Sequence, residues 1–385
     1  MSDRRAFVVV LDACGAGALP DAADYGDAGT NTLVHVAELV GGFELPTLQA
    51  LGLGSIQPIN GVAPAEHPVT HGRLHALGPG KDTISGHWEL MGVVTPKPLR
   101  TYPDGFPDEI TDALRAAWGR EIIGNVAASG TEIIERLGEE QLRTGAAVVY
   151  TSADSVLQIA AHEDVIGLDE LYAMCESARR LMTGEHAVGR VIARPFAGEP
   201  GHFARTLNRH DYALTPPTRS YLQELQDAGV PVHSVGKVAD VFARVGIDEA
   251  HPGPDNATAL ASTSALVREL DHGLVFANLV DTDQKFGHRK DVAGFHHALQ
   301  EIDATVGGWL ERLDPERDLL VLTADHGVDP KHPGTDHTRE HVPLLAAHTG
   351  HGGRRHDGPM ADVGASCLRW LAGRDAGLPG EPFVP

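Results

Sequence analysis

The chain has 385 residues, of which 42% are hydrophobic and 22% are charged, and its formal net charge is −22 at pH 7. This length allows a sizeable core in one large or two medium domains, with the composition of an ordinary soluble globular protein. The acidic charge argues against a nucleic-acid binder and against a protein of anionic membrane surfaces, because both depend on clustered Lys and Arg. A phosphate-bearing substrate would therefore need local cations.

Cysteine use and the N-terminal segment indicate the compartment. Cys14, Cys175 and Cys367 are far apart and form no CxxC pair, so neither a disulfide framework nor a thiolate zinc site is predicted. The apolar run at residues 6–11 is too short for a signal peptide, and no apolar stretch of about 18 residues follows. We expect an unprocessed, soluble protein of the reducing cytoplasm.

The first elements of the chain combine an acidic strand end with a glycine-rich segment. Residues 6–11 read as a buried strand that runs into Asp12, and a helix is expected at residues 32–40. The segment 78–92 then enters a helix through glycines, with Asp82 or Thr83 as its cap. A hydroxyl at that helix start would lie where free N–H groups and the helix dipole favour an anion. Ser85 is a rival hydroxyl, and for Thr83 by itself a capping role is the more common interpretation.

The pattern of expected strands and helices changes between Pro98 and Pro217, which indicates an inserted domain. We assign residues 98–217 to an inserted α+β domain, and residues 1–97 and 218–385 to the core. Strands and helices alternate again in the second part of the core, which predicts an α/β fold with a largely parallel sheet flanked by helices on both faces. The expected elements are a helix at 108–118, strands at 146–151 and 190–194 and a helix at 169–182 in the insertion, then strands at 230–235, 274–280 and 319–323 and helices at 257–270 and 293–313.

Three of the expected core strands end in acidic residues, namely Asp12, Asp283 and Asp325. Ligands bind at the carboxyl edge of open α/β sheets, and carboxylates that meet there repel one another unless cations lie between them. Three nearby histidines, His288, His326 and His337, raise the set to six nitrogen and oxygen ligands, enough for two divalent metal ions. Such mixed ligands suit manganese or zinc better than calcium. Asp281 is a rival to Asp283.

A hydroxyl beside two divalent metals is the arrangement that phosphoryl transfer needs. The metals would lower the hydroxyl pKa and neutralise the charge of the transferring group, and Thr83 would form a covalent phosphoester that divides one difficult step into two. The chemistry predicted from the residues is therefore phosphoryl transfer through Thr83.

Characteristic motifs are spread along nearly the whole chain. They are Val-Leu-Asp12, Gly80-Lys-Asp-Thr83-x-x-Gly-His-Trp-Glu89, Ala128-Ser-Gly-Thr-Glu132, Tyr150-Thr-Ser-Ala-Asp-Ser-Val156, Arg190-Val-Ile-Ala-Arg-Pro-Phe196, Asn208-Arg-x-Asp-Tyr212, Gly287-His-Arg289, Thr323-Ala-Asp-His-Gly327 and Asp336-His-Thr-Arg-Glu340. Through these motifs the chain resembles, nearly from end to end, the phosphopentomutases of the alkaline phosphatase superfamily.

The resemblance implies a role for each site residue. Thr83 would be the phosphorylated nucleophile between two metal ions, usually manganese, and Asp283 would be a ligand in preference to Asp281. One ion would be held by Asp283, His288 and His337, and the other by Asp12, Asp325 and His326. The inserted domain would be a cap over the sugar phosphate. Ser152, Arg190 and Arg205 of the cap, with Lys237 of the core, would hold the distal phosphate and the sugar, whereas Arg194 reads as a buried partner of a cap carboxylate. Segment 281–286 is less apolar than the family pattern.

The reaction implied by the resemblance interconverts ribose 1-phosphate and ribose 5-phosphate, and the 2-deoxyribose pair, through a sugar bisphosphate that also acts as activator. The enzymatic alternatives are a metal-dependent phosphatase or phosphodiesterase of the same superfamily, and a cofactor-independent phosphoglycerate mutase, whose nucleophile is serine. A third alternative is a non-catalytic protein that binds metal or sugar phosphate. The sequence Lys81-Asp-Thr83 and the complete ligand set favour the pentose mutase.

Overall fold

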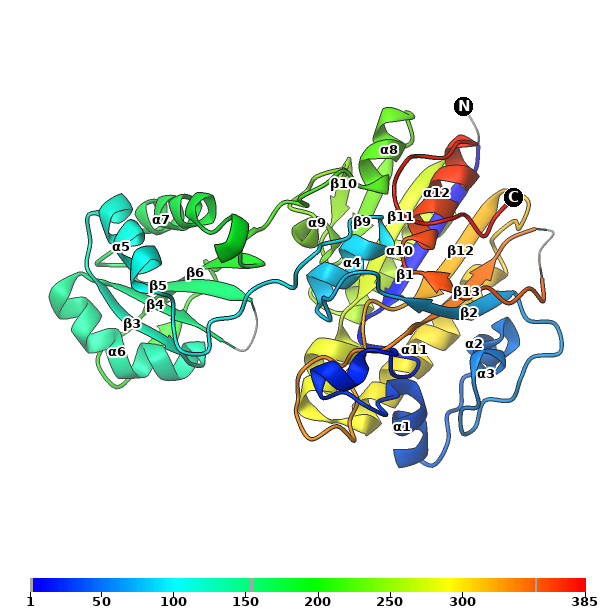
Figure 1. The fold of residues 1–385 in the computed structure, drawn as a ribbon, viewed down its shortest axis with the longest axis horizontal. Helices are drawn as coiled ribbons and strands as arrows, with labels where there is room; N and C mark the ends of the chain where they lie inside the picture. The colour runs from blue at the N-terminus through cyan, green and yellow to red at the C-terminus, as the bar shows by residue number, and fades with distance from the viewer. Residues whose placement is uncertain (1–2, 153–154, 350–351) are drawn as a thin grey trace. The chain divides into compact units, whose positions relative to one another are not determined.

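The computed structural model describes residues 3–152, 155–349 and 352–385 and divides the chain into two compact units (Figure 1). The first unit comprises the chain up to Pro98 together with Pro216–Pro385, and the second is Leu99–Thr215. The second unit thus spans residues 99–215, whereas the sequence predicts an inserted domain at residues 98–217.

The first unit is built around an eight-stranded sheet with the order β10-β9-β11-β1-β12-β13-β2-β14. Pairing is parallel from β10 to β12, β13 runs antiparallel to both β12 and β2, and β14 is parallel to β2. Every residue of β1, β11 and β12 is buried, as expected for parallel strands covered on both faces. The strands are β1 (Arg5–Leu11), β2 (Thr70–His75), β9 (Val232–Val235), β10 (Glu249–His251), β11 (Gly273–Leu279), β12 (Asp318–Thr323), β13 (Val342–Ala347) and β14 (Gly358–Pro359).

Capped amphipathic helices flank this sheet. Asp291 accepts a hydrogen bond from the backbone N–H of Gly294 at the start of α11, and α11 buries Phe295, Leu299 and Ile302 at helical spacing. The helices are α1 (Thr32–Leu39), α2 (Pro46–Leu51), α3 (Leu53–Ile56), α4 (Thr83–Leu90), α8 (Tyr221–Asp227), α9 (Val238–Val241), α10 (Asn256–Glu269), α11 (Val292–Leu310) and α12 (Asp362–Ala372), with the short turns η1 (Ala22–Tyr25), η3 (Thr282–Phe286) and η4 (Gly287–Arg289).

The second unit is a three-layer structure with a mixed sheet in the middle. Its strand order is β3-β4-β5-β6-β7, with β8 paired to β6. Alternate residues of β4 enter two cores, because Val149 packs in the cluster that includes residues of α5 and α7, while Val148 packs in the cluster that includes residues of α6. The elements are α5 (Asp108–Trp118), β3 (Ile122–Ala127), α6 (Gly130–Thr144), β4 (Ala147–Thr151), β5 (Val156–His162), α7 (Leu168–Leu181), η2 (Gly184–His186), β6 (Arg190–Ala197), β7 (Ala204–Arg205) and β8 (His210–Ala213).

The predicted α/β fold with a largely parallel sheet flanked by helices is confirmed in the first unit. The central strand β1 lies between β11 and β12, with Leu11 opposite Leu279 and Val10 opposite Thr323. This register brings the carboxyl ends of all three strands to one edge of the sheet. No helix in the described part of the chain combines the length and apolar character needed to cross a membrane.

A buried ion pair joins β1 to β12 at the opposite edge of the sheet. The Arg5 guanidinium donates to both Asp318 oxygens, at 2.7 and 2.6 Å, and Arg5 and Asp318 are register partners. Removing one member leaves the other charge buried and unpaired, so Arg5→Met is expected to lower the free energy of unfolding by about 3–5 kcal/mol. Urea unfolding measures this loss. Arg312→Met, at an exposed position, should change stability by about 0.5 kcal/mol or less, and an equally small effect of Arg5→Met would contradict the prediction.

Candidate active site

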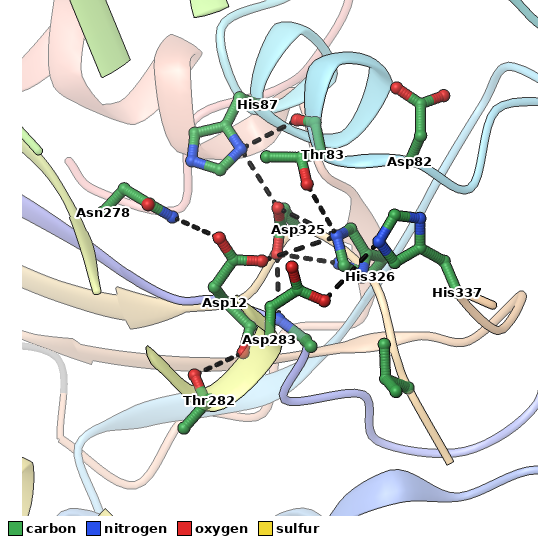
Figure 2. Close-up of polar contacts among 12 residues, drawn as sticks. Asp12, Asp82, Thr83, His87, Asn278, Thr282, Asp283, Asp325, His326 and His337 are labelled. Atoms are coloured by element: carbon green, nitrogen blue, oxygen red, sulfur yellow. Dashed lines mark hydrogen bonds and ion pairs between the residues drawn. The ribbon is translucent and has the colours of Figure 1, made fainter. Parts of the chain in front are cut away.

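The carboxyl edge of β11, β1 and β12 gathers buried acidic side chains (Figure 2). Asp12 directly follows β1, and Asp325 lies two residues after β12. Asp283 lies in η3, a π-helical turn that follows β11, and the Thr282 hydroxyl of this turn donates to the Asp12 carbonyl at 2.6 Å. Such turns recur at functional sites because they redirect side chains from a regular element.

Three histidines complete two groups of candidate ligands. Asp12, Asp325 and His326 form one group, and Asp283, His288 and His337 form the other; within each group one ligand atom per residue lies within 4.8 Å of the others. The His326 and His337 rings are 4.1 Å apart between centroids, so the two groups are adjacent. The closest ligand contacts are His326 Nε2 to Asp325 Oδ2 at 3.3 Å and to Asp12 Oδ1 at 3.5 Å, and Asp283 Oδ1 to His288 Nε2 at 3.2 Å and to His337 Nε2 at 3.5 Å.

The chemistry of this donor set fits two divalent cations. Asp12 Oδ1, Asp283 Oδ1, Asp325 Oδ2 and His337 Nε2 are buried, and within the described residues their contacts are ion-pair approaches of 3.1–3.5 Å rather than hydrogen bonds of good geometry. Buried polar atoms are normally satisfied, so four such atoms at one edge of the sheet indicate ligands to an ion.

The ionisation of these groups reflects their crowding. Burial, together with the charges of Asp325 and Asp283, raises the pKa of Asp12 well above its ordinary value. Burial acts on Asp283 in the same direction, but His288 and His337 outweigh it and hold the pKa of Asp283 well below its ordinary value. Burial also lowers the pKa of His326 to about 4, which leaves its imidazole neutral near pH 7, the form that binds metals.

The candidate nucleophile lies at the start of α4. Thr83 is half-buried, and its Oγ1 is 3.2 Å from His326 Nε2 (Figure 2). The N-cap of α4 is Asp82, whose carboxylate accepts hydrogen bonds from the backbone N–H groups of Ile84 and Ser85. The expectation that free N–H groups of this helix would favour an anion is therefore wrong for those two groups, because a carboxylate already occupies them.

The two rival residues have other partners. The Ser85 hydroxyl donates to Asp82 at 2.7 Å and belongs to the cap. One Asp281 oxygen accepts from the Lys285 ammonium at 2.9 Å, and Asp281 is in neither group of ligands. Both side chains thus have structural roles that separate them from Thr83 and Asp283.

His87 and Asn278 support the site and were assigned no role from the sequence. His87 Nδ1 is 2.9 Å from the Thr83 carbonyl and 3.1 Å from Asp325 Oδ2. Because both neighbours are acceptors, the proton is assigned to Nδ1, and His87 links the nucleophile helix to a candidate ligand. Asn278 donates to Asp12 Oδ2 at 2.9 Å (Figure 2). The Gly-His-Trp-Glu motif contained a signal for His87, whereas Asn278 lies inside an apolar strand without one.

Buried polar contacts hold the loop that carries His337. The Glu340 carboxylate accepts hydrogen bonds from the Thr32 and Thr338 hydroxyls, both at 2.7 Å. A Cβ added at Gly15 or Gly327 would lie 2.3–2.4 Å from Glu340 oxygens, which leaves no room for a side chain at either position. Arg339 donates to the Gly80 carbonyl at 2.7 Å and so ties this loop to the segment that enters α4.

The remaining predicted residues are divided between the units. In the first unit, Lys237 Nζ lies 3.8 Å from Asp12 Oδ2. In the second unit, Ser152 follows β4, Arg190 begins β6 with its guanidinium 3.6 Å from Asp211, and Arg205 is exposed in β7.

The expected carboxylate partner of Arg194 is wrong. Arg194 donates instead to the Gln158 amide oxygen at 3.0 Å, and its charge interacts with Tyr150, Arg205 and Arg209. The amide oxygen thus takes the place of the expected carboxylate at one nitrogen of the guanidinium.

Because Asp12 lies among other buried carboxylates, we expect Asp12→Asn to stabilise the metal-free protein and to weaken the stabilisation by added metal. Asp12→Asn removes a buried carboxyl from between two others, so in chelator the variant should be about 1–2 kcal/mol more stable than the parent protein. It also removes a ligand, so the stabilisation by added Mn²⁺ should shrink below the roughly 2.7 kcal/mol per site that a hundredfold excess over Kd provides. Thermal unfolding with EDTA and with Mn²⁺ measures both changes.

Asp281→Asn is the matched control for Asp12→Asn. It removes a neighbouring carboxylate outside both groups of ligands, so its response to Mn²⁺ should equal that of the parent chain. A full Mn²⁺ response in Asp12→Asn, or its loss in Asp281→Asn, would show that the ligands are assigned wrongly.

The sequence of this chain is similar to those of known proteins. The model of the Metalloenzyme superfamily matches residues 4–372. A phosphopentomutase from Anaeromyxobacter dehalogenans is 53% identical over 376 residues, covering 97% of this chain and 96% of its own. A phosphopentomutase from Caldanaerobacter subterraneus is 52% identical over 344 residues, covering 89% and 87%.

Two solved structures are similar in fold. The PH0037 protein from Pyrococcus horikoshii has a TM-score of 0.50 at 15% identity and covers 98% of this chain and 99% of its own. Phosphoglycerate mutase from Leishmania mexicana has a TM-score of 0.50 at 14% identity, covering 98% and 97%. The fold is thus shared well beyond recognisable sequence similarity. Because about half of its residues are identical to those of phosphopentomutases over most of the chain, and because the superfamily model matches residues 4–372, the chain belongs to the metalloenzyme superfamily and, within it, to the phosphopentomutase family of metal-dependent phosphomutases.

Proposed function

We propose that this phosphomutase interconverts ribose 1-phosphate and ribose 5-phosphate, and the corresponding 2-deoxyribose phosphates, through a phosphothreonine at Thr83. The observation that carries the proposal is the position of the Thr83 hydroxyl, 3.2 Å from His326 Nε2 and next to two groups of buried ligands. The pentose substrate class is supported by the name that the relatives at 52–53% identity share.

Two divalent ions, Mn²⁺ by preference, fit the two groups of ligands. Asp12, Asp325 and His326 would hold one ion, and Asp283, His288 and His337 the other. When bound, the ions would supply positive charge that lowers the pKa of a hydroxyl and offsets the charge of a phosphoryl group. By donor type alone the two groups accept zinc as well as manganese, and the preference for manganese is what the resemblance to the phosphopentomutases implies.

The residues of the chain itself position and activate the nucleophile. The Asp82 cap fixes the first turn of α4, and His87 joins the Thr83 carbonyl to Asp325. A hydroxyl held in this way loses little conformational entropy when it is positioned to attack phosphorus. Lys237 contributes a cation 3.8 Å from Asp12 and would help to hold the distal phosphate and the sugar.

The reaction balances without water. Phosphothreonine 83 transfers its phosphoryl group to the free hydroxyl of the sugar monophosphate, which forms a sugar bisphosphate and regenerates the Thr83 hydroxyl. The bisphosphate then returns its other phosphoryl group to Thr83, so the product is the isomeric monophosphate. Exclusion of water is essential, because water would compete with the sugar for the phosphothreonine. A sugar bisphosphate would also transfer a phosphoryl group to Thr83 of an unphosphorylated enzyme. This transfer explains why we propose the bisphosphate as the activator.

We propose that Ser152, Arg190 and Arg205 of the second unit bind the phosphate that is not being transferred and the sugar. Arg190 and Arg205 each offer a planar guanidinium suited to bidentate contacts with phosphate. In a chain with a net charge of −22, such local cations are needed to attract an anionic substrate.

Phosphorus NMR tests the proposed reaction. With Mn²⁺, a trace of sugar bisphosphate and ribose 1-phosphate, we expect ribose 5-phosphate to appear without inorganic phosphate. Thr83→Ala should abolish this conversion, whereas Ser85→Ala should retain it within about tenfold, because the Ser85 hydroxyl only supports the Asp82 cap and even the loss of a whole cap costs about 1 kcal/mol. Accumulation of inorganic phosphate would identify a hydrolase instead, and turnover by Thr83→Ala would exclude the phosphothreonine.

The role of the second unit is tested through Arg205. Arg205→Ala should raise KM and also lower kcat/KM by roughly tenfold or more, because contacts with a non-reacting phosphate help to position the reacting one. Arg205→Lys should recover part of the loss, since lysine keeps the charge without the bidentate geometry. Arg136→Ala removes an exposed arginine of the same unit and serves as the control. Equal steady-state constants for Arg205→Ala and Arg136→Ala would remove Arg205 from the substrate site.

A further inference from the structure

Three side chains at the β10 edge of the first unit's sheet direct ligand atoms toward one another. His233 lies on β9, and Glu249 and His251 lie on the edge strand β10. Their ligand atoms lie within 4.8 Å of one another. His233 Nδ1 is 3.2 Å from His251 Nε2 and 3.7 Å from Glu249 Oε2, while His251 Nε2 is 3.6 Å from Glu249 Oε1.

Strand pairing creates this arrangement. In the parallel register His233 is opposite Glu249, and His251 follows two residues after Glu249. Residues two apart on a strand share a face, so the three side chains lie on the same face of the sheet, as a cross-strand pair and its diagonal neighbour. The two imidazole rings stack with 19° between their planes. The backbone therefore organises the three side chains in advance.

The spacing matches the coordination of a small transition-metal ion. Ligands about 2.05 Å from a tetrahedral zinc ion lie about 3.3 Å from one another. The two nitrogens are already at 3.2 Å, and the carboxylate is nearly equidistant from them, at 3.6 and 3.7 Å. A hydrogen bond between the histidines explains the first distance, and ion pairs with a protonated imidazole would explain the other two. A shared ion accounts for all three distances with both imidazoles neutral.

We propose that His233, Glu249 and His251 form a third metal site, which binds one divalent ion of the zinc class. Two imidazoles and one carboxylate favour zinc, copper or nickel over the oxygen-preferring magnesium and calcium. The histidine side chains are 12% and 23% exposed, and that of Glu249 is 61% exposed. An ion there is reached from solvent, with a coordination position left for water.

This site is separate from the proposed catalytic centre. His233 is opposite Val275, which is opposite Phe7, five residues before Asp12 along β1. Five residues of strand span about 16 Å, and two further strand spacings separate β9 from β1. The His251 carbonyl accepts a hydrogen bond from the Gly236 N–H at 3.1 Å. An ion would therefore fasten the short edge strand to β9 beside the turn that leads to Lys237.

Zinc alone is the probe for the test. Metal-free protein is equilibrated with excess Zn²⁺, separated by gel filtration and analysed by inductively coupled plasma mass spectrometry. The variant His233→Gln/His251→Gln should carry one zinc ion fewer per chain than the parent protein. The control His67→Gln/His297→Gln removes two exposed histidines that each lie near a single glutamate, and it should retain the parental zinc content.

A second variant keeps the test decisive if the double substitution impairs folding. Glu249→Gln changes an exposed side chain and should weaken zinc binding roughly tenfold or more, since losing even an outer partner of a ligand costs roughly 10- to 100-fold. Mn²⁺-dependent phosphomutase turnover should be unchanged in Glu249→Gln. Equal zinc content and affinity in the parent, Glu249→Gln and His233→Gln/His251→Gln would overturn the proposal and leave a hydrogen bond between two histidines. Because the readout is a difference between variants, it does not depend on the proposed reaction.

Discussion

The mutual repulsion of three buried carboxylates is the constraint on which the rest of the structure depends. Asp12, Asp283 and Asp325 meet at one sheet edge because parallel strands deliver their carboxyl ends together. Burial and, after it, the charges of the other two carboxylates raise the pKa of Asp12 well above its ordinary value. In the proposed metal-bound state cations would offset the mutual repulsion, and three histidines lie where they would complete the coordination.

Much of the surrounding structure supports these ligands rather than contacting a substrate. The Glu340 carboxylate accepts hydrogen bonds from the Thr32 and Thr338 hydroxyls. Arg339, in the same loop as His337, donates a hydrogen bond to the Gly80 carbonyl. His87 performs a similar function between α4 and Asp325. Such partners fix the orientation of ligands and of the nucleophile, so a metal site extends well beyond the atoms that would bind the ion.

The sequence predicted the parts of this structure that depend on regular patterns. Continuous apolar runs located β1, β11 and β12, and the acidic residues after each run predicted where they would meet. Helical periodicity located α5 and α11. The strands β2, β3, β5, β7, β8, β10, β13 and β14 and the helices α6, α8, α9 and α12 were not predicted. The shortest of these elements are fixed by their tertiary neighbours rather than by periodicity, whereas β5, β13, α6 and α12 have apolar patterns that the prediction could have used. The cap of α4, the partner of Arg194 and the role of Asn278 likewise depend on contacts between distant segments, which a single sequence does not display.

The position of β1 in the centre of the sheet has a consequence for biosynthesis. Arg5 and its partner Asp318 are 313 residues apart in sequence, and β1 also pairs with β11. During synthesis β1 therefore stays unpaired and apolar until at least Leu279, the end of β11, has been made, and its second partner β12 follows later. Non-local pairing of this kind slows folding and exposes aggregation-prone surface on the way. The second unit, whose strands all lie within Leu99–Thr215, has no such delay, so the nascent chain can complete this unit while β1, which leads into Asp12, still has no partner strand.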